Sequence, residues 1–138
     1  MSIKLEGRVL LFDKVNVTGD KFSKDCKVTI PEKVPLTFEF RLYALIGCAY
    51  VIKDDLGIYA KAEIIPNDYI SDEDLKNILN DRKKIGVGGF YNRIKRHEEC
   101  GIDIIDEATL LSIGLTSYPV CDEYFLEIVE NKKWLIQY

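Results

Sequence analysis

The chain has 138 residues and a mass of 15.9 kDa, enough for one domain with a sizeable buried core. Hydrophobic residues make up 47% and charged residues 30% of the sequence, a balance typical of folded proteins, and the formal charge of −4 disfavours a nucleic-acid partner. No apolar run approaches the roughly 20 residues of a membrane helix, and charged residues interrupt any signal-peptide core near the N-terminus, so we expect neither a membrane partner nor secretion by that route.

The first half of the chain alternates apolar and polar residues, as strands do. Ile58, Ala60, Ala62 and Ile64, for example, alternate with polar or aromatic neighbours, and the preceding Asp-Asp-Leu-Gly predicts a tight turn. Glycine and aspartate at 19–20 predict another turn. The predicted extended segments cover residues 3–12, 26–30, 34–45, 46–53 and 58–65.

One helix is predicted over residues 71–81. Ser71 is a candidate N-cap, and Asp74 lies three residues later in a position like that of a capping box. Acidic residues fill the first turn, where the helix dipole favours anions, so their placement fits a helix start better than a metal site.

The second half of the chain also alternates. Residues 85–99 and 101–120 are predicted to be extended, and residues 124–138 form a predicted hairpin that turns at Asn131-Lys132. The whole sequence therefore predicts a single, mainly β (α+β) domain over residues 1–138. We expect a mostly antiparallel barrel of about seven strands with one short helix and a C-terminal hairpin.

The cysteines give no sign of a metal centre. They lie at positions 26, 48, 100 and 121, too far apart for a Cys-x-x-Cys pair, and His97 is the single histidine. His97 and Cys100 could contribute two ligands, but lone thiols in proteins are usually small buried hydrophobes. We expect no metal and no other cofactor.

Three glycines in "IGVGGF", residues 85–90, invite comparison with phosphate-binding loops. A phosphate loop needs a lysine and a hydroxyl residue after its last glycine, and a dinucleotide loop opens a helix. Here the glycines run into a strand-like segment, so a bulge or a close approach of two backbones explains them better.

Five segments in this order resemble the prohead (procapsid maturation) serine proteases of tailed phages, a family with the assemblin-like fold of herpesvirus maturation proteases. The similar segments are "LEGRVLLFDKVNVTGDKF", "VPLTFEF", "IGCAYVIKDDLGIYAKAEI", "IGVGGFYNRIKR" and "IDEATLLSIGLTSYPVCDE". They span about residues 5–125. The resemblance implies an assemblin-like barrel and a role in capsid assembly.

The residues that the family uses for catalysis are replaced at the matching positions. Its histidine base follows the Val-Pro-Leu strand, where this chain has Phe40, and its serine nucleophile precedes Ile-Gly-Gly or Ile-Gly-Phe, where this chain has Gly86. Neither residue can exchange a proton or attack a carbonyl. Two weaker candidates remain, namely His97 as a base and Ser112, which also precedes Ile-Gly, as a nucleophile.

These replacements favour a non-catalytic virion structural protein, an auxiliary, decoration or assembly protein that binds the major capsid protein or other head proteins. Such a protein would be made in the host bacterial cytoplasm, would reside in the capsid, and could form a homo-oligomer. Two alternatives stay open: an active maturation protease with a non-standard site, and an unrelated β-barrel binding module.

The aromatic residues of the C-terminal hairpin are the predicted partner contacts: Tyr124, Phe125, Trp134 and Tyr138. An exposed edge of that hairpin could pair with a strand of the partner. The alternative is that the hairpin completes the chain's own barrel.

Overall fold

The computed structural model describes residues 3–65, 84–116 and 118–129, and every regular element in these ranges is a β-strand. The strands are β1 (Ile3–Leu11), β2 (Asp20–Thr29), β3 (Lys33–Phe38), β4 (Arg41–Lys53), β5 (Gly57–Ile64), β6 (Lys84–Glu99), β7 (Ile102–Leu115) and β8 (Phe125–Ile128). The predicted mainly β class is confirmed. The helix predicted over residues 71–81 and the second arm of the predicted C-terminal hairpin lie outside the described residues.

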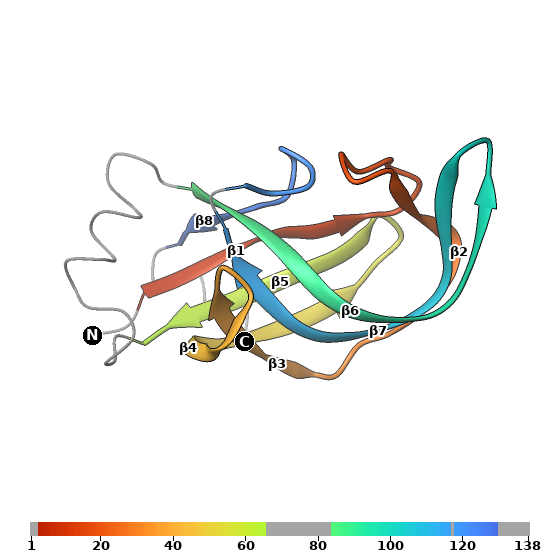
Figure 1. Ribbon diagram of the computed structural model, residues 1–138. Coiled ribbons are helices and arrows are strands. Elements are labelled where there is room, and N and C mark those ends of the chain that lie inside the picture. Colours follow the sequence, from red (N-terminus) through yellow and green to blue (C-terminus); the bar gives the residue numbers. More distant parts are fainter. Residues whose placement is uncertain (1–2, 66–83, 117, 130–138) are drawn as a thin grey trace.

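Seven of these strands close into a barrel. Hydrogen-bonded neighbours follow the order β7-β3-β4-β5-β1-β8-β6, and β6 returns to β7 (Figure 1). β2 is an additional strand that pairs with β7. Closure gives each strand of the ring a neighbour on both sides, which removes most of the free edges that an open sheet would expose.

β7 pairs with three strands, because β2 and β3 share one of its edges. Residues 103–109 of β7 pair with β2, and residues 113–115 pair with β3, in both cases parallel. β6 runs antiparallel along the other edge. The barrel is thus mostly antiparallel as predicted, but its sheet is mixed. The parallel ladders join segments far apart in the sequence, which local alternation cannot reveal.

Side chains at alternate strand positions fill the barrel interior. Ile58, Ala60, Ala62 and Ile64 of β5 are completely buried, as their alternation predicts. Two alanines lie between two isoleucines in this row, and this mixture of small and large side chains lets the facing strands interdigitate. The other strands add further fully buried aliphatic residues: Leu5, Leu36, Ile46, Leu110, Ile113 and Leu115.

The predicted hairpin of β4 and β5 is confirmed, with an antiparallel register from Gly47–Ile64 to Lys53–Ile58. Asp54 organises its turn by accepting hydrogen bonds from the backbone N–H groups of Leu56 and Gly57, at 2.9 and 3.0 Å. The Arg8 guanidinium also donates to this carboxylate, and its hydrogen bond is the main reason that the pKa of Asp54 is lowered.

The C-terminal half of β6 and the N-terminal half of β7 form a long hairpin, which curves past the ring together with β2 (Figure 1). Cys100 and Gly101 make its turn, with φ angles of 51° and 80°. Positive φ at both central residues is the geometry of the tight turns that join antiparallel strands. Ile105 and Ala108 on its β7 arm are completely buried and belong to the core, whereas residues 92–99 of β6 are exposed.

We predict that Leu36→Ala destabilises the protein by about 2–5 kcal/mol, because it leaves a cavity in the barrel core. Leu56→Ala is the matched control, since Leu56 is 62% exposed whereas Leu36 is completely buried. The control should change the free energy of unfolding by less than about 0.5 kcal/mol. Urea unfolding followed by circular dichroism measures both, and equal losses would contradict the described barrel interior.

Candidate functional site

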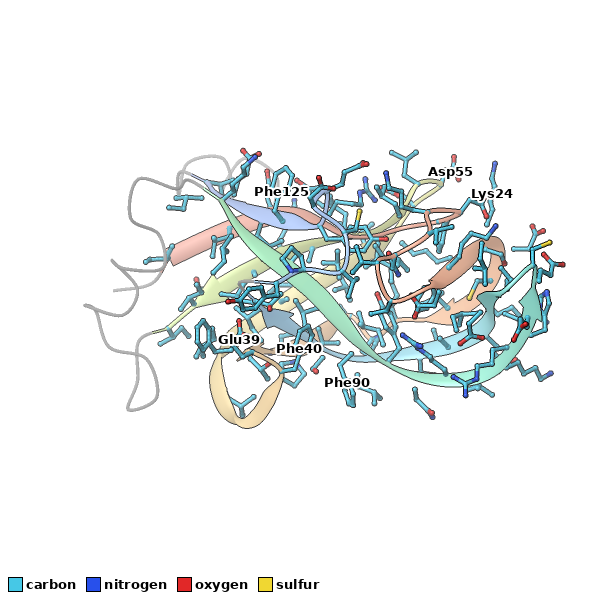
Figure 2. The ribbon with its side chains drawn as sticks, turned by 45° about the horizontal axis from the view of Figure 1, so that its top comes forward. Lys24, Glu39, Phe40, Asp55, Phe90 and Phe125 are labelled. Carbon is cyan, nitrogen blue, oxygen red and sulfur yellow. The ribbon has the colours of Figure 1, made fainter. Side chains whose placement is uncertain are left out.

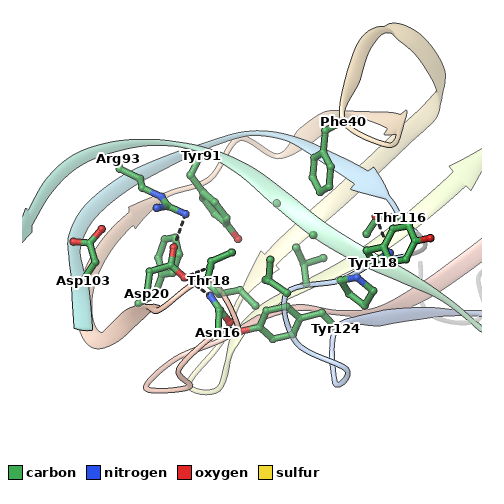
Figure 3. A pocket seen from close by; sticks show the side chains of 17 residues that line it. Asn16, Thr18, Asp20, Phe40, Tyr91, Arg93, Asp103, Thr116, Tyr118 and Tyr124 are labelled. Atoms are coloured by element: carbon green, nitrogen blue, oxygen red, sulfur yellow. Dashed lines mark hydrogen bonds and ion pairs between the residues drawn. The ribbon is translucent and has the colours of Figure 1, made fainter. Parts of the chain in front are cut away.

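A cavity of about 290 Å³ lies where the loop between β1 and β2, the middle of β6 and the segment before β8 meet (Figure 3). Aromatic side chains form much of its wall: Phe22, Phe40, Tyr91, Tyr118 and Tyr124. Its polar and charged lining residues are Asn16, Thr18, Asp20, Arg93, Asp103 and Thr116. An apolar hollow with a few convergent polar groups is the usual form of a small-ligand site.

The carboxylate of Asp20 is the best-satisfied polar group of this cavity. Its Oδ1 accepts hydrogen bonds from the Asn16 amide at 2.9 Å and the Thr18 hydroxyl at 3.0 Å, and its Oδ2 lies 2.6 Å from the Arg93 guanidinium. Asp20 is only 3% exposed, so these donors replace the water that its charge has lost. The carboxylate ties the β1–β2 loop to β6.

The predicted turn at residues 19–20 positions these groups. Gly19 has a φ of 82°, which favours glycine, and its N–H donates to the Asn16 carbonyl at 2.9 Å. The Asn16 N–H in turn donates to the Asp20 carbonyl at 2.8 Å. The loop therefore holds both side chains at the cavity by its own backbone hydrogen bonds.

Two buried oxygens at the cavity have no hydrogen-bond partner among the described residues, the Asn16 Oδ1 and the Tyr91 hydroxyl. Asn16 is 6% exposed, and its amide nitrogen is already used by Asp20. The Tyr91 ring packs on Phe22 with ring centres 4.7 Å apart. Burial raises the pKa of Tyr91 far above its usual range, so its hydroxyl stays protonated.

Tyr124 differs from Tyr91 because its hydroxyl is satisfied. It accepts a hydrogen bond from the Leu11 N–H at 3.2 Å and donates to the Leu11 carbonyl at 3.4 Å. Burial raises the pKa of Tyr124 to about 12. The side chain is 1% exposed, so the prediction that Tyr124 contacts a partner is wrong in this structure: the residue belongs to the barrel core.

Phe40, which takes the expected place of a histidine base, lies between β3 and β4 at the cavity wall (Figure 3). Its ring covers Gly88 and Gly114, which face each other across the β6–β7 ladder. A Cβ on either glycine would meet the ring at 3.0 or 2.7 Å. The ring thus occupies the space that side chains at those two positions would need.

Gly86, the expected place of the serine, has Thr116 and Pro119 as its nearest neighbours. It lies two residues earlier on β6, where its carbonyl accepts a hydrogen bond from the Thr116 N–H at 2.9 Å. A Cβ there would meet the Thr116 carbonyl and the Pro119 side chain at 2.6 and 2.9 Å. The glycine that Phe40 contacts is Gly88, which lies on the same face of β6 because strand side chains alternate. Sequence spacing did not distinguish these two glycines.

His97 lies on the long β6–β7 hairpin, outside the cavity. Its Nδ1 is 2.5 Å from an Asp106 carboxylate oxygen, and its Nε2 is 3.3 Å from a Glu99 carboxylate oxygen. Hydrogen bonding to Asp106, and then to Glu99, raises the pKa of His97. Both ring nitrogens therefore face carboxylates, and neither faces a hydroxyl.

Ser112 is buried on β7 and lies opposite Phe90, whereas His97 lies opposite Ile104. These register positions are separated by about 25 Å at the usual rise of a strand. The structure therefore does not bring the two weaker catalytic candidates together.

The first arm of the predicted C-terminal hairpin, β8, lies between β1 and β6. Phe125 is opposite Arg8 on one side and Gly86 on the other, and the Lys84 ammonium lies 4.5 Å from its ring centre. Both edges of β8 are used, so this arm completes the chain's own barrel and offers no free edge to a partner. Contact through the Phe125 side chain stays a prediction, and Trp134 and Tyr138 lie outside the described residues.

Residues 3–65, 84–116 and 118–129 contain no group of three or more histidine, cysteine, aspartate or glutamate residues that could hold a metal ion. The same residues include no helix long and apolar enough to cross a membrane.

No protein-family model and no curated protein matches the chain. Among solved structures, the chain is similar to a crystal structure of KSHV protease in complex with a hexapeptide phosphonate inhibitor, with a TM-score of 0.61 and 9% sequence identity. The match covers 99% of this chain and 69% of that one. That neighbour is a herpesvirus assemblin, so the expected assemblin-like fold is confirmed.

A likeness at this identity shows the fold alone. It argues against the alternative of a barrel without assemblin-like geometry. The narrower resemblance to phage prohead proteases stays a prediction.

We predict opposite effects when the two cavity tyrosines lose their hydroxyls. Tyr91→Phe removes a buried oxygen without a partner, so the free energy of unfolding should stay the same or rise by up to about 1 kcal/mol. Tyr124→Phe deprives the Leu11 N–H of its acceptor and should cost about 1–2 kcal/mol. Thermal and urea unfolding of both variants provide the measurement, and a larger loss for Tyr91→Phe would show that its hydroxyl has a structural partner.

We also predict that His97 titrates above its ordinary pKa of about 6.5 and that Asp106→Asn moves it back toward that value. A raised folded-state pKa means that protonated His97 stabilises the fold. This contribution is fully present below about pH 6.5 and is lost as the pH rises through the folded-state pKa. NMR titration of the imidazole protons tests this. A wild-type pKa at or below 6.5, or no response to Asp106→Asn, would contradict the ion pair.

Proposed function

We propose that the chain is a non-catalytic relative of capsid-maturation proteases and serves as a structural protein of a tailed-phage capsid. It would bind the major capsid protein as an auxiliary or assembly protein. The observation that carries this proposal is the location of the single histidine, which lies on the β6–β7 hairpin between two carboxylates, about 30 Å along β6 from the glycine that Phe40 covers.

A serine protease needs an imidazole within hydrogen-bond reach of its nucleophilic hydroxyl. His97 does not meet this requirement, because Asp106 and Glu99 are its partners. At the cavity, Phe40 provides a phenyl ring that cannot accept a proton. The geometry therefore supports a fold that is kept for binding, and the active protease with a non-standard site remains the alternative to be tested.

The outer face of the β6–β7 ladder supports a contact with a large partner. Phe90 lies opposite Ser112, which follows Leu111 on β7, and Ile94 lies farther along β6. Phe90, Leu111 and Ile94 are all nearly half exposed. Figure 2 shows Phe90 pointing away from the barrel on the same side as Phe40. Apolar side chains grouped on a surface are typical of protein contact sites. In this proposal they face the capsid protein.

The decisive experiment is the analysis of purified mature particles by mass spectrometry. The proposal expects the intact chain in the particles, and its absence would overturn the structural role. Phe90→Asp combined with Leu111→Asp should lower incorporation at least about tenfold, because two carboxylates would have to be buried at the interface. Ile52→Asp, at an equally exposed position on β4, is the matched control and should leave incorporation unchanged.

Labelling of the purified chain with a fluorophosphonate, which reacts with activated serines, tests the alternative. We expect no labelling in the wild type or in His97→Ala. Labelling that disappears in His97→Ala would identify an active site and would refute the non-catalytic assignment.

A further inference from the structure

The cavity between the β1–β2 loop and β6 has a composition that its structural role does not explain. An enclosed space lined only by side chains of the core would be apolar, and its polar groups would be paired. This one contains an Asn16 oxygen and a Tyr91 hydroxyl that are both buried and both without a partner. Each unpaired buried oxygen lowers the stability of the protein unless something else satisfies it.

Both unpaired oxygens can accept a hydrogen bond. The Asn16 Oδ1 is an acceptor only, since its amide nitrogen already donates to Asp20. The Tyr91 oxygen accepts as well as donates, and the hydroxyl stays neutral. A single ligand group that donates to both oxygens has to carry more than one hydrogen, as an ammonium group does.

The paired charges and the aromatic rings of the cavity disfavour an anion and favour the same group. Its charged lining residues are Asp20, Asp103 and Arg93, two carboxylates and one guanidinium. Arg93 is engaged by Asp20 at 2.6 Å, so it is not free to attract an anion. Asp103 is paired as well, with the Arg96 guanidinium at 3.4 Å. The aromatic rings of the wall are what attracts a cation, because ring faces carry partial negative charge.

The aromatic walls determine the chemistry of the part of the ligand that carries the ammonium group. Water could satisfy the two oxygens, but it would leave the rings of Phe22, Phe40 and Tyr91 hydrated. An apolar stem displaces that water and gains the free energy of burying apolar surface. The volume of about 290 Å³ is at the lower end for ligand pockets, so it suits a single side chain or a small molecule.

We propose that this cavity binds a primary ammonium group carried on an apolar stem, with Asn16 and Tyr91 as its hydrogen-bond acceptors. The ammonium can come from a lysine side chain of a partner protein or from a free aryl- or alkylamine. The site does not depend on the capsid role proposed above, and it can be tested on the isolated chain.

NMR titration of the isotope-labelled protein with phenethylammonium tests the site. We expect a Kd of the order of 1 mM, typical for a ligand of this size, with shifts at the amides of Gly88, Gly89 and Val120, which line the cavity. Phenylpropionate has the same ring with an anionic head and should bind at least about tenfold more weakly. Equal binding of the two, or shifts elsewhere on the barrel, would overturn the proposal.

Two variants separate ligand recognition from structure. Tyr91→Phe should weaken phenethylammonium binding about three- to tenfold, since it removes one acceptor. Tyr59→Phe is the matched control, because Tyr59 lies on β5 and does not line the cavity, and it should leave the Kd unchanged within about twofold. An unchanged Kd in Tyr91→Phe, or the same loss in both variants, would refute the assigned acceptors.

A second pair of probes distinguishes the source of the ammonium. Nα-acetyl-lysine methylamide should shift the same amides as phenethylammonium if a protein side chain can enter, whereas the norleucine analogue should not. Binding of phenethylammonium alone supports a free amine as the ligand. Binding of neither amine would overturn the proposal.

Discussion

Closure of the ring at β7 is the constraint on which the rest of the structure depends. β7 must satisfy the backbone groups of β6 along one edge and those of β2 and β3 along the other. β8 is much shorter, and it pairs with β6 only over residues 84–86. Beyond Val87, whose N–H donates to the Tyr124 carbonyl, β6 no longer has a strand on that edge. The cavity opens there, and its first lining residue on β6 is Gly88.

The buried carboxylate of Asp20 fixes the chain segments that form the polar end of the cavity. Three donors from two parts of the chain converge on it, and losing any of them would leave charge in a poorly solvated place. The β1–β2 loop is thereby fixed against β6 at the polar end of the cavity. Because Arg93 and the Asn16 amide nitrogen are both engaged in this fixation, the unpartnered groups beside it are the Asn16 oxygen and the Tyr91 hydroxyl, and both can accept a hydrogen bond. The selectivity proposed for the cavity thus follows from the way its wall is held together.

The barrel could be predicted from the sequence where its strands pair with near neighbours. The alternation of β5 and the turn after Asp54 are local signals, and both predicted the structure correctly. The parallel ladder of β3 with β7 could not be predicted in this way, because Ile113 follows Leu36 by 77 positions in the sequence.

The site was harder to predict than the fold for a related reason. The cavity forms where β8 no longer covers the edge of β6, so its position depends on the length of β8. The sequence gives no signal that β8 is only four residues long. The sequence resemblance matched the histidine base to Phe40 and the serine nucleophile to Gly86, two positions that would face each other in an active site. In the structure the Phe40 ring packs on Gly88 instead. Tyr124 was expected to contact a partner as an aromatic residue of the C-terminal hairpin, but its hydroxyl is held by Leu11 inside the barrel. The unpaired oxygen of Asn16 has no signature in sequence at all.

Phe40 takes part in both proposals: it stands where an active protease is expected to have its histidine base, and it forms a wall of the proposed binding cavity. Glu39 and Phe40 both have positive φ angles, of 52° and 60°, which costs on the order of 1 kcal/mol for each residue other than glycine. The Glu39 N–H donates to the Leu115 carbonyl at 2.8 Å, and the Phe40 ring packs on two glycines; both contacts offset that strain. A polar side chain at position 40 would lose much of this packing. The same ring forms a wall of the cavity, so the contact that stabilises the turn also shapes the space available to a ligand.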